Sequence, residues 1–151
     1  NVPSEQFTVE VVHFDELVAV AGPEHPLRKK RKLAPGELAG APFICRERGS
    51  GSREVIEAAL AERGVQLTPA MALGSTEAIK NAVAAGLGVA ILSRLTVELE
   101  LRAGRLALLD LRDFNLRRAL YMVQLRGKHR GPAVESFVEK LREALGPLRE
   151  S

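Results

Sequence analysis

Short apolar runs that alternate with helix-like stretches place the strongest constraint on how this chain can fold. Residues 17–21, 43–45 and 89–92 are such runs. A run of this length without polar interruptions is typical of a strand that is covered on both faces. Because helix-like stretches separate these runs, and strands alternating with helices are typical of one fold class, we predict an α/β fold.

Further elements follow from local patterns. Residues 7–12 alternate apolar and polar side chains, and short strand-like pieces are expected at 71–73, 106–109 and 120–125. Residues 96–101 are ambiguous, because they alternate like a strand but contain Glu and Leu, which are good helix formers.

Three helices are predicted. One follows residues 50–53 and ends at Gly64, where a left-handed C-terminal cap belongs. The second is capped by Ser75 or Thr76 and ends at Gly86. The third spans 132–145, starts with a proline, and carries an apolar stripe of Val134, Phe137, Val138, Leu141 and Leu145.

Composition excludes several classes of protein. The chain has 151 residues, of which 46% are hydrophobic and 27% are charged, so it suits a soluble globular domain and not a disordered segment. One cysteine cannot form an internal disulfide, and no run approaches the roughly 20 apolar residues of a membrane span. Residues 1–6 do not resemble a signal peptide.

The charge balance is mildly basic, at +3 with histidine neutral. The one dense basic run is 28–32, RKKRK, which suits either a phosphate-contacting patch or a solvated surface loop. We favour the surface loop, since aromatic residues make up only 4% of the chain and offer little for nucleic-acid bases to stack on.

Two loops of small hydroxyl residues lead into predicted helices, each after a strand. They contain Ser50, Gly51, Ser52 and Arg53 in one case, and Gly74, Ser75 and Thr76 in the other. A helix N-terminus has unpaired amides and a partial positive charge, so these loops suit an anionic ligand. The alternative is that the hydroxyls only cap their helices.

The chain shows no sign of catalysis or of a bound metal. Cys45 sits in an apolar run and reads as an inert core residue. The three histidines are scattered without metal-ligand spacing, and no grouping of Ser, His and Asp stands out. We therefore predict no enzyme activity, no metal and no cofactor.

Three spaced motifs resemble the LysR-type bacterial transcriptional regulators. Residues 13–27 (HFDELVAVAGPEHPL) are similar to the family's D-E-L-V-x-V-x-x-P-x-H-P-L stretch, and residues 47–53 are similar to its E-x-G-S-G-T-R segment. The most recognisable family run is matched by residues 75–92. Within the family, residues 78–88 and 92–106 are most similar to the CbbR subgroup, activators of Calvin-cycle carbon-fixation operons.

The resemblance implies a fold like that of the periplasmic binding proteins, with two Rossmann-type lobes and an effector site in the cleft between them. The second lobe would be 43–119, while 1–42 and 120–151 would belong to the first lobe and the hinge. Effector-binding roles carry over to Ser50, Gly51, Ser52, Arg53, Ser75 and Thr76, and more weakly to the backbone of Gly22. The family also makes 96–101 a short helix.

The resemblance further implies a cytoplasmic homodimer or homotetramer that binds DNA through a winged helix-turn-helix absent from this sequence. The start of the first lobe is absent too, so we expect a fragment that exposes apolar surface. The function expected is that of an effector-sensing domain for a small anionic metabolite. The alternative is a periplasmic-type solute receptor, which the upstream sequence would distinguish by a signal peptide.

Overall fold

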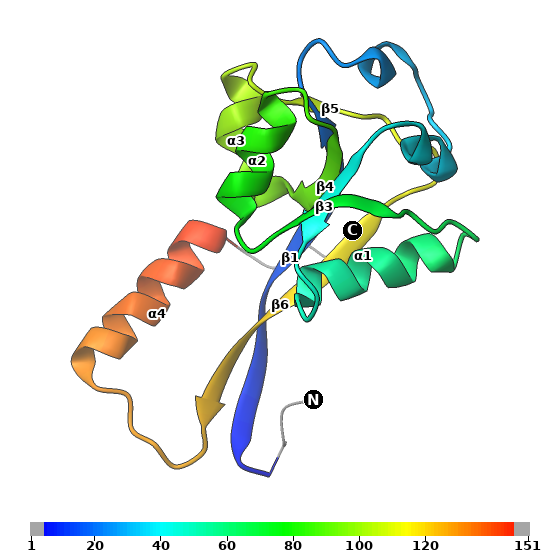
Figure 1. Cartoon of the computed structure of the whole chain (residues 1–151). Coiled ribbons are helices and arrows are strands. Elements are labelled where there is room, and N and C mark those ends of the chain that lie inside the picture. The colour runs from blue at the N-terminus through cyan, green and yellow to red at the C-terminus, as the bar shows by residue number, and fades with distance from the viewer. Residues whose placement is uncertain (1–4, 147–151) are drawn as a thin grey trace. The chain divides into compact units, whose positions relative to one another are not determined.

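The computed structural model describes residues 5–146 and is shown in Figure 1. Contacts divide the chain into a larger unit, Glu16–Leu116, and a smaller unit made of Asn1–Asp15 and Arg117–Ser151. Strand β1 (Phe7–Ala21) contributes its first part to the smaller unit and its second part to the larger one.

The larger unit is built on a mixed sheet with the strand order β3-β2-β4-β1-β5. Strand β2 (Phe43–Arg46) runs parallel to both β3 (Pro69–Leu73) and β4 (Val89–Ser93). Strand β1 is antiparallel to β4 and to the short β5 (Ala107–Leu108). This arrangement confirms the predicted α/β class.

Helices cover both faces of this sheet (Figure 1). Helix α1 (Gly51–Ala61) packs into one apolar cluster through Ile56 and Leu60. Helices α2 (Thr76–Ala84) and α3 (Arg94–Arg102) pack into a second cluster through Ile79, Val83 and Val97. Alternate residues of β2 and β4 enter opposite clusters, which explains why both strands read as continuous apolar runs.

The basic run lies on the surface of the larger unit, as predicted. It overlaps the short 3-10 helix Pro26–Lys29, and residues 28–32 are all exposed. A second 3-10 helix, Pro35–Gly40, buries Leu38 completely, and Leu33 is 1% exposed. These two leucines attach the surface segment with the basic run and the two 3-10 helices to the core.

The smaller unit pairs β6 (Leu116–Leu125) with β1 and adds helix α4 (Pro132–Leu145). Arg142 on α4 forms an ion pair with Glu10 on β1 at 2.7 Å. The predicted limits of this helix are confirmed. Its apolar stripe is only partly covered, since Val138 is buried whereas Val134 and Phe137 are exposed.

The structure corrects one expectation and resolves one ambiguity. Residues 7–12 and 17–21 belong to one strand, because Asp15, at 1% exposure, stays in the strand and pairs with Arg118. Residues 96–101 are helical, as the family resemblance implies. The larger unit also begins before the second lobe proposed at 43–119, because residues 17–21 pair with β4. The division into lobes remains a prediction.

None of the helices in the described part of the chain is long and apolar enough to cross a membrane.

Gly88 offers a test of the close packing between β4 and the segment before β2. It has a φ of 158°, and a Cβ there would collide with the carbonyl oxygen of Pro42, which accepts a hydrogen bond from the Val89 amide at 2.9 Å. We expect Gly88→Ala to lower the free energy of unfolding by about 1–3 kcal/mol, as overpacking does. Urea denaturation measures this loss.

The matched control is Gly40→Ala, because a Cβ at Gly40 meets nothing within 4 Å. It should change the free energy of unfolding by no more than about 0.5 kcal/mol. Equal losses in the two variants would contradict the packing argument.

Candidate functional site

The two hydroxyl loops lie side by side at one edge of the sheet. Because β2 and β3 are parallel, their carboxyl ends meet there, with Arg46 opposite Leu73. The amide of Glu47, the first residue beyond β2, donates a hydrogen bond to the Leu73 carbonyl at 3.2 Å. This is the edge at which ligands bind in open α/β sheets.

At the first loop, the hydroxyl of Ser50 does not cap α1. Ser50 is the N-cap residue, with extended backbone, but its side chain makes no capping hydrogen bond. The capping alternative is therefore wrong for the Ser50 hydroxyl, although the Ser50 carbonyl accepts a hydrogen bond from the Glu54 amide at 3.1 Å. Gly51 is exposed and Ser52 is half-buried beside it.

Arg53 is already engaged within the protein. Its Nε donates to Glu57 Oε1 at 2.6 Å and its Nη1 donates to the Arg46 carbonyl at 3.1 Å. The side chain is 13% exposed, and the Glu57 hydrogen bond raises the pKa of Arg53. Direct contact with a ligand would require Arg53 to leave these partners.

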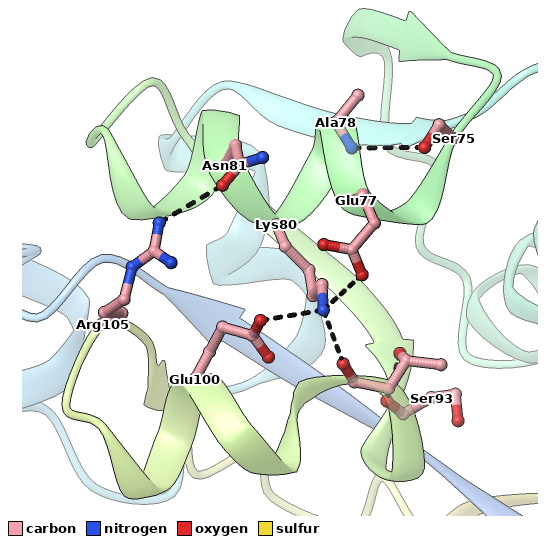
Figure 2. A network of polar contacts seen from close by, with 9 residues as sticks. Ser75, Glu77, Ala78, Lys80, Asn81, Ser93, Glu100 and Arg105 are labelled. Atoms are coloured by element: carbon pink, nitrogen blue, oxygen red, sulfur yellow. Dashed lines mark hydrogen bonds and ion pairs between the residues drawn. The ribbon is translucent and has the colours of Figure 1, made fainter.

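At the second loop, Ser75 does act as a helix cap. Its hydroxyl accepts a hydrogen bond from the Ala78 amide at 3.4 Å, as Figure 2 shows. Thr76 follows as the first residue of α2 and is half-buried. The capping interpretation holds for Ser75, which leaves Thr76 as the second hydroxyl group of this loop.

Gly22 lies at the opposite edge of the sheet. It follows the end of β1, where Ala21 pairs with Val89 at the start of β4. A Cβ at Gly22 would lie 2.9 Å from the Val83 carbonyl oxygen, so close approach to α2 accounts for the glycine. The structure therefore does not bring Gly22 together with the hydroxyl loops.

Sequence reasoning missed a third helix N-terminus at the same edge as the loops. Strand β4 ends at Ser93, which is the N-cap of α3, and Arg94 begins that helix. Arg94 forms an ion pair with Glu16 of β1 at 3.4 Å. The alternating pattern of residues 96–101 concealed this helix start, and the short helix that the resemblance implied there was the signal that could have revealed it.

The side-chain charges at this edge are paired locally. Arg46 donates two hydrogen bonds to Glu47, each 2.8 Å long, which lowers the pKa of Glu47 to about 2. Three helix N-termini thus begin at an edge where the Glu47 carboxylate is paired with Arg46. Such an arrangement can bind an anion through backbone amides and hydroxyls.

No acid–base or metal chemistry appears at this edge. Cys45 lies in the core, and burial raises the pKa of its thiol, as expected of an inert residue. Within residues 5–146, no group of three or more His, Cys, Asp or Glu side chains could hold a metal ion.

Comparison with known proteins identifies the family. The model of the LysR substrate binding domain matches residues 1–146. The chain belongs to this family. It is the effector-binding domain of a LysR-type regulator and not an enzyme, which confirms both predictions.

Relatives support the predicted subgroup. The chain is 42% identical over 141 residues to a RuBisCO operon transcriptional regulator of Acidithiobacillus ferrooxidans, covering 92% of this chain and 46% of that protein. It is 41% identical over 128 residues to the regulator CbbR of Rhodospirillum rubrum, covering 85% of this chain and 42% of the relative. The chain spans about half the length of these relatives.

Solved structures confirm a periplasmic-binding-protein-like fold. The Synechocystis CcmR regulatory domain, in complex with 2-PG (2-phosphoglycolate), matches with a TM-score of 0.80 and 31% identity, covering 96% of this chain and 70% of that one. The effector-binding domain of QuiR, in complex with shikimate, matches with a TM-score of 0.77 and 20% identity, covering 96% and 68%. The second likeness shows the fold alone.

The Arg46–Glu47 pair gives a prediction for the titration of the Glu47 carboxyl group. Arg46→Met removes the hydrogen bonds that lower the pKa of Glu47, so its titration midpoint should rise from about 2 toward the ordinary 4.5. The ion pair acts only while Glu47 is ionised, so its effect is full above pH 4.5 and disappears as the pH falls through 2. Carboxyl NMR shifts followed from pH 1.5 to 6 measure the midpoint.

Arg48→Met is the control, since Arg48 is an exposed neighbour and the pKa of Glu47 is lowered by Arg46. A Glu47 midpoint that moves as far in Arg48→Met as in Arg46→Met would refute the assignment to Arg46.

Proposed function

We propose that this domain binds a small anionic metabolite, and that the full-length regulator uses this binding to control its contacts with DNA and hence transcription. The observation that carries the proposal is the convergence of α1, α2 and α3 N-termini at one sheet edge. Hydroxyl groups flank these N-termini, and the neighbouring Arg46 and Arg94 are each paired with a glutamate.

The effector seen in a relative fits this chemistry. CcmR was solved in complex with 2-PG, whose carboxylate and phosphate are both anionic. Helix N-termini attract such groups through their free amides and partial positive charge. The uncapped first turn of α1 and the Thr76 hydroxyl at α2 would supply donors to an anion of this size.

For the whole protein, we propose a cytoplasmic homodimer or homotetramer that contacts DNA through a winged helix-turn-helix outside this sequence. Effector binding would stabilise one arrangement of the domain and so shift DNA affinity. Coupling of this kind typically amounts to 1–3 kcal/mol, or about 5–150-fold in affinity.

Calorimetry with chemically matched ligands tests the anion proposal. The full-length regulator should bind 2-phosphoglycolate or a related dianionic metabolite, and should bind neutral or cationic analogues of the same size much more weakly. A preference for neutral or cationic ligands would exclude an anion site.

Thr76→Ala tests the second loop. Removal of the hydroxyl should weaken effector binding by about 10–150-fold, as loss of a hydrogen bond to a charged ligand does. Ser136→Ala, an exposed hydroxyl on α4, is the matched control. If Thr76→Ala binds effector as tightly as Ser136→Ala, Thr76 does not touch the effector. DNA affinity without effector verifies that each variant is folded.

A further inference from the structure

A buried lysine joins the two helices that start at the effector edge. Lys80 of α2 is only 7% exposed. Its Nζ donates hydrogen bonds to Glu100 Oε1 at 2.8 Å and to the Thr96 carbonyl at 3.0 Å, both on α3, and it pairs with Glu77 at 2.5 Å (Figure 2). An ammonium group has three N–H donors, so all of them are used inside the protein.

The lysine is charged over the whole physiological pH range. Burial disfavours its ammonium, but the hydrogen bonds that Lys80 donates to Glu100 and Glu77 outweigh burial and raise the pKa of Lys80. The same contact lowers the pKa of Glu100. Lys80 therefore acts as a fixed cationic clamp and not as a pH switch.

Stability of the core does not by itself explain this clamp. Glu100 Oε2 is buried, and no described residue supplies it with a hydrogen bond. Buried ion pairs can often be replaced by apolar residues without loss of stability. What an apolar pair cannot supply is a directional contact that sets the distance and register between two helices.

The clamp acts on the first turns of both helices. Glu77 lies in the first turn of α2, and Thr96 lies in the first turn of α3, where its own hydroxyl donates to the Ser93 carbonyl at 2.8 Å. Arg105 bonds Asn81 at 3.3 Å further from the edge, but that link is exposed. Of these two links, the one made by Lys80 is buried and lies closer to the helix starts at Ser75–Thr76 and Ser93–Arg94.

We propose that Lys80 is a positioning residue of the effector site, a role that rests on the proposed function. By holding the first turns of α2 and α3 in one register, it fixes the amides that both helices present to the effector. Ligand sites need their donors held within about 0.5 Å, which requires locked supporting side chains. Lys80 never contacts the effector itself.

A pair of variants separates positioning from stability. Lys80→Met alone leaves the Glu100 carboxylate without its cation. This single variant should therefore be less stable than the wild type. The double variant Lys80→Met/Glu100→Leu removes both charges and should recover wild-type stability in urea denaturation. In the full-length regulator, the double variant should still bind 2-phosphoglycolate about tenfold more weakly. Arg105→Gln removes the exposed link and the weaker charge interaction of Arg105 with Glu100 but keeps the Lys80 contacts, so it should bind within about twofold of wild type.

Hydrogen exchange supplies a readout that does not need the effector. Amides of residues 78–80 and 96–98 should exchange faster in the double variant than in the wild type, although the two proteins are equally stable. Wild-type affinity in the double variant, or unchanged exchange at these amides, would overturn the proposal. If the wild type does not bind 2-phosphoglycolate, the anion proposal loses its support with this probe, and the exchange rates alone decide the role of Lys80.

Discussion

The parallel pairing of β2 with β3 and β4 is the constraint on which the larger unit depends. Parallel strands all end at the same edge of a sheet, so the helices that follow them must begin there. Burial of β2 on both faces holds this register, since Ile44 faces one cluster while Phe43 and Cys45 face the other. The convergence of three helix N-termini is therefore a consequence of strand direction and not of any local motif.

Local signals in the sequence were sufficient to predict the limits of elements that are bounded by proline or glycine. Helix α4 has its predicted limits because Pro132 fits the first helical position and Gly146, with a φ of 68°, ends the helix in a left-handed conformation. Residues 96–101 were harder, because Leu95, Val97 and Leu99 alternate. The structure explains the ambiguity: Val97 alone is buried, whereas Leu95 and Leu99 are exposed on the helix.

Features that depend on distant partners could not be read from the sequence. Residues 7–12 and 17–21 were predicted as separate elements, but Asp15 between them pairs with Arg118, which lies 103 residues away in the chain. Lys80 sits in an amphipathic helix, where a lysine normally faces solvent, and its partly buried partner Glu100 is 20 residues further on. Gly22 was carried over only from the family resemblance, and the antiparallel pairing of β1 with β4, which the sequence does not reveal, puts it at the other edge of the sheet.

The pairing of charges at the effector edge decides what kind of recognition is possible there. Arg46, Arg53 and Arg94 each pair with a glutamate, so their charges are largely cancelled at a distance. Attraction for an anion must then come from the exposed Arg48 and from the backbone amides of the helix first turns, and the attraction of the amides falls off within a turn. Recognition at such short range depends on where the helices start, which makes the register between α2 and α3 as important as the donors themselves.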